Sequence, residues 1–310
     1  MIDFGLEINR IKREKNAVIL AHYYQRPEVQ EVADFIGDSL NLAYKANETP
    51  ADIIVFAGVL FMAETAKIIC PGKKVLVPDF EAGCSLSDNC TAVQFKKFID
   101  RYPDHTVVSY INCSAEVKAM SDVICTSSNA VKIVESLPAD RPIIFAPDKN
   151  LGRYVKEVSG RDLVLWDGSC FIHESFSEVK ILDLKKKHPD AEIIAHPECA
   201  EIVIMIADHI GSTAQLIRYA KQSSKKEFIV VTEAGILHEM QKEMPEKILI
   251  PAPPSYYTSC NCGECPYMKL TTLEKIYSCL VNETPEIFVP DQVQGPAMRA
   301  IEKMFELTEK

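Results

Sequence analysis

The apolar run Ala17-Val-Ile-Leu-Ala-His22 decides the fold, because it is the first of three similar runs. A charged segment with an amphipathic helical pattern precedes each run. The pairs of segment and run are 7–15 with 17–22, 94–102 with 106–110, and 179–188 with 192–196. When the runs are aligned, His22, Tyr110 and His196 become equivalent, 88 and 86 residues apart. Self-similarity at a regular spacing predicts three structural repeats.

A second polar side chain follows each aligned position by two residues. These side chains are Tyr24, Asn112 and Glu198. Residues i and i+2 of a strand lie on the same face, so each repeat presents two polar groups on one side of a strand, near its carboxyl end. Ligands bind at this end of the strands in parallel sheets. The sequence therefore predicts a site built from three strand ends.

A hydroxyl occurs seventeen residues after the aligned position in every repeat, at Ser39, Ser127 and Thr213. Each of these residues opens a helical pattern. Ser and Thr are favoured N-caps, and the free N–H groups of a helix N-terminus bind anions. We therefore expect the three hydroxyls both to cap helices and to line a pocket for anionic groups.

Each repeat continues with a predicted strand, a helix and a second strand. The ranges are 52–57, 63–69 and 74–78, then 142–146, 151–158 and 163–166, and finally 228–232, 236–244 and 248–250. Strands that alternate with helices predict parallel sheets with helices on both faces. A cysteine follows the last strand of every repeat, at Cys84, at Cys170 and within the group Cys260, Cys262 and Cys265.

The pattern predicts an α/β fold of three pseudo-threefold-related α/β/α domains, whose short parallel sheets surround a central site. The domains are expected at residues 1–90, 91–177 and 178–270, the last with the cysteine-rich loop. The tail, residues 271–310, contains helical patterns and is expected to pack on the first domain. Polar groups, hydroxyls and one thiol per domain would then converge on the axis.

Composition limits the classes of partner. The chain has 310 residues, 47% of them hydrophobic, and a net charge of −10, which argues against nucleic acids and anionic membranes. It shows no signal peptide and no apolar run of the roughly 20 residues needed to span a bilayer. We expect a cytoplasmic protein whose eleven cysteines stay reduced rather than paired.

Three converging thiolates suit an iron–sulfur cluster better than a structural zinc ion, which takes four ligands. The remaining cysteines have a simpler interpretation as small core residues. They are Cys70, Cys90, Cys113, Cys125, Cys199 and Cys279. Two of them have a second interpretation. Cys90 is the alternative to Cys84 as a ligand, and a role of Cys199 in the site is left open because it follows Glu198. His173, three residues after Cys170, is either a pocket group or an exposed loop residue.

Several motifs resemble those of the quinolinate synthase family, along essentially the whole chain. They are Leu20-Ala-His-Tyr-Tyr-Gln25, Asp34-Phe-Ile-Gly-Asp-Ser39, Phe61-Met-Ala-Glu-Thr-Ala-Lys67, Pro147-Asp-Lys-Asn-Leu-Gly152, His196-Pro-Glu-Cys199 and Cys265-Pro-Tyr-Met268. The resemblance implies three pseudo-symmetric α/β domains around a central [4Fe-4S] cluster. It also implies a reaction of NAD biosynthesis, in which iminoaspartate and dihydroxyacetone phosphate condense to quinolinate with loss of phosphate and two waters.

The resemblance also assigns residues. The cluster ligands would be Cys84, Cys170 and Cys265. The substrate-binding residues would be His22, Ser39, Tyr110, Asn112, Ser127, His196, Glu198 and Thr213. Tyr24 resembles the catalytic tyrosine of the family, and we expect Glu198, His22 and His196 to share the acid–base work. An aspartate oxidase or dehydrogenase would supply the iminoaspartate.

One motif departs from the family pattern. Some members have Cys-x-x-Cys-x-x-Cys before the Pro-aromatic-Met sequence, whereas this chain has Cys-x-Cys-x-x-Cys at Cys260, Cys262 and Cys265. A redox disulfide between Cys260 and Cys262 therefore does not carry over, and the two residues are left as either simple loop residues or transient cluster-delivery thiols. The alternative functions at this stage are another [4Fe-4S] hydro-lyase, an electron-transfer iron–sulfur protein and a zinc-binding structural protein.

Overall fold

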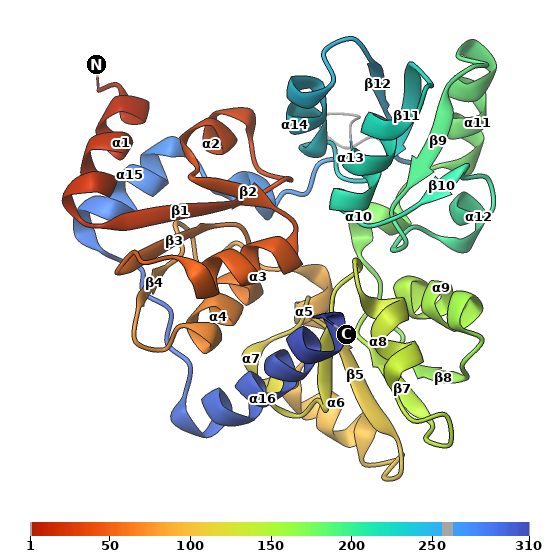
Figure 1. The fold of residues 1–310 in the computed structure, drawn as a ribbon, viewed down its shortest axis with the longest axis horizontal. Coiled ribbons are helices and arrows are strands. Elements are labelled where there is room, and N and C mark those ends of the chain that lie inside the picture. The colour runs from red at the N-terminus through yellow and green to blue at the C-terminus, as the bar shows by residue number, and fades with distance from the viewer. Residues whose placement is uncertain (1, 256–262, 310) are drawn as a thin grey trace.

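The computed structural model describes residues 2–255 and 263–309 and contains three four-stranded parallel sheets. The strand orders are β2-β1-β3-β4, β6-β5-β7-β8 and β10-β9-β11-β12, which is one order repeated three times. Figure 1 shows the three sheets with their helices as three lobes around a common centre. The predicted fold class is therefore confirmed. The residue limits of the three domains stay a prediction.

The elements follow the same sequence in each unit. The first unit contains α1 (Phe4–Glu14), β1 (Ala17–His22), α2 (Pro27–Val32), β2 (Phe35–Gly37), α3 (Ser39–Glu48), β3 (Ile53–Ala57), α4 (Leu60–Ile69), β4 (Lys74–Leu76) and α5 (Ser85–Asn89). The second contains α6 (Ala92–Ile99), β5 (Thr106–Tyr110), α7 (Ala115–Ala119), β6 (Val123–Cys125), α8 (Ala130–Ser136), β7 (Ile143–Ala146), α9 (Lys149–Ser159), β8 (Leu163–Leu165) and α10 (Phe171–Glu174). The third contains α11 (Glu178–Lys187), β9 (Glu192–Ala195), α12 (Glu201–Ile204), β10 (His209–Ile210), α13 (Thr213–Gln222), β11 (Glu227–Val231), α14 (Ile236–Glu243) and β12 (Ile248–Pro251).

Each sheet has one strand more than the sequence pattern predicted. The added strands are β2, β6 and β10, of two or three residues each, which is too short for a hydrophobic period to be visible. An aspartate just before each of them accepts a hydrogen bond of 2.7–2.8 Å from a backbone N–H of the neighbouring strand. These residues are Asp34, Asp122 and Asp208, which repeat at the spacing of the units.

Alternate residues of each central strand face the centre of the molecule, where the three units meet. In β1, Val18 and Leu20 belong to a core cluster that runs through all three units, whereas Ile19 and Ala21 pack in a separate cluster under α1. The central strands β5 and β9 divide in the same way between the shared core and an outer cluster. His22 therefore lies on the inward face with Leu20.

The tail divides between two units. The helix α15 (Leu273–Asn282) packs against α1 and β3 of the first unit. The helix α16 (Asp291–Glu309) packs mainly against α7, β6 and α8 of the second unit, with a smaller contact to α4, as the dark blue helix in Figure 1 shows. The expectation that the tail packs on the first unit is therefore wrong for α16. Its apolar residues, among them Ala300, Ile301 and Met304, join the core that the units share.

None of the described helices is long and apolar enough to cross a membrane. The short helix η1 (Met268–Leu270) follows the cysteine loop of the third unit. Cys260 and Cys262, whose function the sequence left open, lie outside the described residues.

Candidate active site

A cavity lies between the three units, and every side chain predicted for the site lines it. The predicted substrate-binding and catalytic residues in its wall are His22, Tyr24, Ser39, Tyr110, Asn112, Ser127, His196, Glu198 and Thr213. The three predicted cluster ligands are there as well, at Cys84, Cys170 and Cys265. Since each unit supplies several of these groups, the cavity exists only in the assembled chain.

The two histidines end equivalent strands and adopt the same local geometry. His22 is the last residue of β1, and His196 follows β9 directly. The Nδ1 atom of His22 accepts the backbone N–H of Tyr24 at 3.2 Å, and Nδ1 of His196 accepts that of Glu198 at 3.3 Å. Burial lowers the pKa of both rings to about 3. At neutral pH both rings are therefore uncharged, and the proton is on Nε2, where it can be donated.

The three hydroxyls line the cavity, but the prediction that they cap helices is wrong. Asp38 caps α3 and Ser212 caps α13, so that Ser39 and Thr213 are the first helical residues. Ser127 lies in the turn that precedes α8. A capping side chain folds back onto the N–H groups of its own helix. A hydroxyl next to the cap is not used in this way and can face the cavity.

Glu198 is the charged centre of the cavity wall. Its Oε1 atom accepts the Tyr110 hydroxyl at 2.5 Å, and its Oε2 atom lies 3.2 Å from Nδ1 of His173, an ion-pair contact without hydrogen-bond geometry. Burial raises the pKa of this carboxyl, but His173, His196 and the Tyr110 hydroxyl together lower it to about 2. Glu198 is therefore ionised at neutral pH and can accept a proton.

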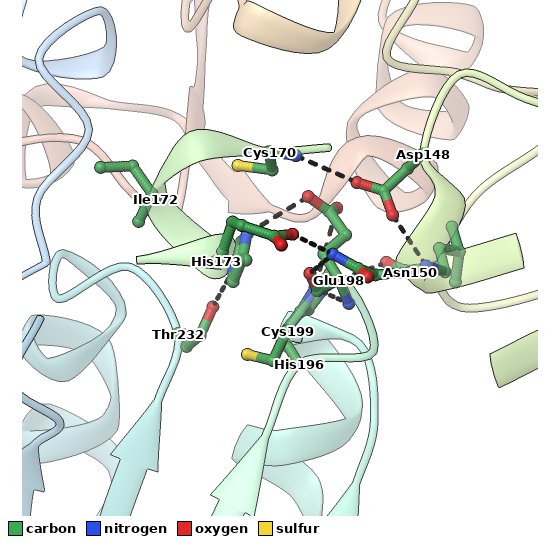
Figure 2. Close-up of polar contacts among 12 residues, drawn as sticks. Asp148, Asn150, Cys170, Ile172, His173, His196, Glu198, Cys199 and Thr232 are labelled. Carbon is green, nitrogen blue, oxygen red and sulfur yellow. Dashed lines mark hydrogen bonds and ion pairs between the residues drawn. The ribbon is translucent and has the colours of Figure 1, made fainter. Parts of the chain in front are cut away.

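A chain of hydrogen bonds leads from His173 to Tyr24. The Nε2 atom of His173 lies 2.9 Å from Oγ1 of Thr232, and Figure 2 shows His173 between this threonine and Glu198. The Tyr24 hydroxyl bonds Oγ1 of Thr232 at 2.7 Å and Oγ1 of Thr213 at 2.9 Å. Burial raises the pKa of Tyr24 well above its ordinary value, so the phenol stays protonated. His173 is thus a buried pocket residue, and not an exposed one.

Asn112 carries an acceptor that is available to a ligand. Its Oδ1 atom is buried and has no hydrogen-bond partner among the described residues. A buried acceptor without a partner costs free energy. A bound molecule with a donor at this place would remove that cost, so the atom fits a substrate contact.

The three cavity cysteines differ from the other six that the structure describes. Cys84, Cys170 and Cys265 are partly exposed, whereas the others are buried, namely Cys70, Cys90, Cys113, Cys125, Cys199 and Cys279. Cys90, the alternative ligand, packs in the outer cluster of the second unit with Phe95.

The donor set fits a metal cluster. Burial raises the pKa of Cys84 to about 12, that of Cys265 to about 11 and that of Cys170 well above its ordinary value. The proximity of the thiols to one another contributes to these shifts. Three neighbouring thiols with raised pKa values become thiolates together only beside a strong positive charge, which a metal cluster provides.

Sequence reasoning missed several groups around the cavity. Asp38 and Glu233 line it, and Thr232 connects His173 to Tyr24. Ser128 Oγ lies 2.8 Å from both Asp38 Oδ2 and Ser212 Oγ, so the helix starts of the three units meet. Asp38 and Ser212 stand at corresponding positions of the first and third repeats, and a fuller alignment of the repeats would have found them.

The comparisons with known proteins agree on one family. Residues 6–306 match the family model described as quinolinate synthetase A protein. A quinolinate synthase of Microcystis aeruginosa is 60% identical over 306 residues, 99% of this chain and 95% of that protein. Similar proteins of that name occur in Trichodesmium erythraeum, 60% identical over 96% of this chain and 92% of its own, and in Nostoc punctiforme, 59% identical over 99% and 94%.

Proposed function

The chain belongs to the quinolinate synthase family of enzymes, and we propose that it condenses iminoaspartate with dihydroxyacetone phosphate to quinolinate, releasing phosphate and two waters. One observation carries the proposal. The residues that resemble the substrate-binding set of the family are scattered from His22 to Thr213, yet all of them line one cavity together with three thiols.

Cys84, Cys170 and Cys265 would hold a [4Fe-4S] cluster, with one ligand from each unit. When bound, the cluster supplies a Lewis acid, because three protein ligands leave one iron open to a substrate oxygen or nitrogen. Polarisation of this kind is worth several kcal/mol in a transition state. The other lining residues bind and orient the substrates beside it.

Substrate anions would be held by neutral groups rather than by many cations. Both substrates are anionic, whereas the chain carries a net charge of −10. Ser39 and Thr213 offer hydroxyls from the first residues of α3 and α13, where free N–H groups and the helix dipole favour anions. The uncharged rings of His22 and His196 add N–H donors that can bind carboxylate or carbonyl oxygens.

Proton transfers would run between Glu198 and Tyr24. The ionised Glu198 carboxylate serves as the base, and the protonated Tyr24 phenol serves as the acid. His173 and Thr232 lie between the two: Thr232 bonds both Tyr24 and His173, and Nδ1 of His173 lies 3.2 Å from the Glu198 carboxylate. Each acid or base is expected to contribute a factor of about 10²–10⁴ to the rate.

The imine substrate is unstable in water, so its source is part of the function. We propose that an aspartate-oxidising enzyme, either an oxidase or a dehydrogenase, supplies the iminoaspartate. The cavity is enclosed by three units and its titratable residues are largely buried, which limits hydrolysis once the imine is bound.

Anaerobic purification followed by an assay for quinolinate from the two substrates tests the proposal. A brown, iron-containing protein that forms quinolinate is the expected result. An iron-containing protein that is inactive with these substrates would point instead to another cluster-dependent hydro-lyase. A colourless protein with one bound zinc ion would contradict the cluster.

A further inference from the structure

Two buried carboxylates bind the backbone of the cysteine loops. Oδ2 of Asp148 accepts the backbone N–H of Cys170 at 3.2 Å, and Figure 2 shows this contact beside the Cys170 side chain. Oε1 of Glu233 accepts the backbone N–H of Cys265 at 2.9 Å. The exposed fractions of Asp148 and Glu233 are 0% and 1%, so neither carboxylate is a surface group.

The two carboxylates occupy equivalent places in the fold. Asp148 stands two residues beyond the end of β7, and Glu233 stands two residues beyond the end of β11. The corresponding residue of the first unit, two residues beyond β3, is Val59. There the cysteine loop is held through the main chain, where Leu60 N–H donates to Ala82 O at 2.7 Å. A carboxylate at this place therefore occurs in the second and third units. In the first unit the carboxylate beside the Cys84 backbone N–H is Asp88 of α5, four residues further along the same loop.

Each carboxylate joins its cysteine loop to a rigid part of its own unit. The second oxygen of Asp148 accepts the N–H of Leu151 at 2.7 Å and caps α9. The second oxygen of Glu233 accepts the N–H of Gly235 at 2.7 Å, and its first oxygen also accepts Lys269 Nζ at 2.9 Å. Hydrogen bonds at both oxygens leave these side chains no other orientation, so the N–H of each cysteine is held in one direction.

We propose that Asp148 and Glu233 are positioning residues that aim the thiols of Cys170 and Cys265 at a shared metal cluster. The inference rests on the proposed function, because that function supplies the cluster. Groups around the ligands of a metal site fix ligand orientation, and their loss typically costs 10–100-fold in metal affinity.

Amide substitutions separate this role from helix capping. In Asp148→Asn one oxygen remains where two were needed, so the side chain can cap α9 or bind Cys170, and not both. Asn is itself a favoured N-cap, so the helix keeps its start. Asp148→Ser also keeps a cap but is too short to reach Cys170. Glu233 accepts from three donors, the N–H groups of Cys265 and Gly235 and Nζ of Lys269. In Glu233→Gln only one side-chain oxygen remains for all three.

Matched controls come from the aspartates near β6 and β10. Asp122 and Asp208 also accept a backbone N–H, from Val107 at 2.7 Å and from Ile193 at 2.8 Å, and these bonds join neighbouring strands of the sheets rather than the described parts of the cysteine loops. Asp122→Ala and Asp208→Ala remove the same kind of bond from the same two units without touching the cluster ligands, whereas Asn would keep it through its Oδ1 atom.

The experiment measures cluster retention in the full chain, purified anaerobically. Iron per chain and the loss of visible absorbance under an iron chelator are followed for every variant, and thermal unfolding is followed for the cluster-free proteins. We expect Asp148→Asn, Asp148→Ser and Glu233→Gln to lose the cluster about tenfold faster than the unchanged chain, with cluster-free unfolding temperatures like those of the controls.

Loss rates within about twofold of the unchanged chain would overturn the inference while leaving the proposed function intact. Equally fast loss in the control variants would also overturn it, because the effect would then be general destabilisation. An unchanged chain that holds no iron would overturn both the inference and the cluster of the proposed function.

Discussion

Replacing His22 by asparagine should make the fold less sensitive to acid. The pKa of His22 in the folded chain is about 3, below the value of about 6.5 for an unfolded histidine. Below pH 6.5 the unfolded chain therefore binds the proton and the folded chain does not. The contribution of His22 to stability is fully present above pH 6.5 and is lost as the pH falls toward 3.

The magnitude follows from the two pKa values. At pH 5 the pH is about 1.5 units below the pKa of an unfolded histidine, and each unit is worth about 1.4 kcal/mol. The protonation of His22 in the unfolded chain should therefore lower the free energy of unfolding by about 2 kcal/mol relative to pH 8. This difference does not depend on the exact pKa of His22 in the folded chain, provided that this pKa stays below about 4. His196, with the same pKa of about 3, should cost about as much again.

Urea unfolding at pH 8 and pH 5 measures the effect, first in the cluster-free chain and then in the loaded one. Asparagine is the suitable replacement, because its Oδ1 atom can accept the N–H of Tyr24 as Nδ1 of His22 does. The buried carboxyls Asp148 and Glu233, whose pKa values are raised by burial, respond to acid in the opposite sense. The comparison between variant and unchanged chain removes their contribution.

The free energy of unfolding of the unchanged chain should fall by about 2 kcal/mol more than that of His22→Asn between pH 8 and pH 5. The double variant with His196→Asn should show about twice this difference. Equal losses in the variant and the unchanged chain would mean that His22 titrates normally. Its ring could then be a cation in the cavity, and its assignment as a neutral donor to substrate oxygens would be refuted.

Three further predictions concern the site directly. Glu198→Gln should lower kcat by about 10²–10⁴-fold with the iron content unchanged, as steady-state kinetics and iron analysis would show. Tyr24→Phe should lower kcat by about 10²-fold or more and leave KM nearly as it is, whereas a rise in KM alone would make the phenol a binding group. Cys84→Ser should abolish the visible absorbance of the cluster and Cys90→Ser should keep it; the reverse result would make Cys90 the ligand in place of Cys84.

The repeat in the sequence predicted much of the fold, because strands and helices are governed by local periods. The run that ends at His22 alternates between two cores in the structure, as a strand covered on both faces must. The short strands β2, β6 and β10 were missed, because two or three residues carry no period. The capping role assigned to Ser39 was misplaced by one residue, since a sequence pattern locates a helix start only approximately.

The placement of α16 could not be read from the sequence. Its amphipathic pattern showed that one face is buried, but such a face fits any apolar groove of suitable shape. Packing against α7, β6 and α8 was decided by the surfaces that the assembled units leave open. Amphipathic periodicity indicates which face of a helix is buried. The elements that this face packs against depend on the rest of the molecule.

The sequence by itself determined the three α/β units, their strand ends and many of the residues that line the cavity. Only the tertiary structure decided how these residues act on one another. Asp148 and Glu233 reach Cys170 and Cys265 across 22 and 32 residues, and Tyr110 reaches Glu198 across 88. Local periods govern a strand or a helix, whereas pKa values and loop orientations depend on distances between side chains that only packing brings together.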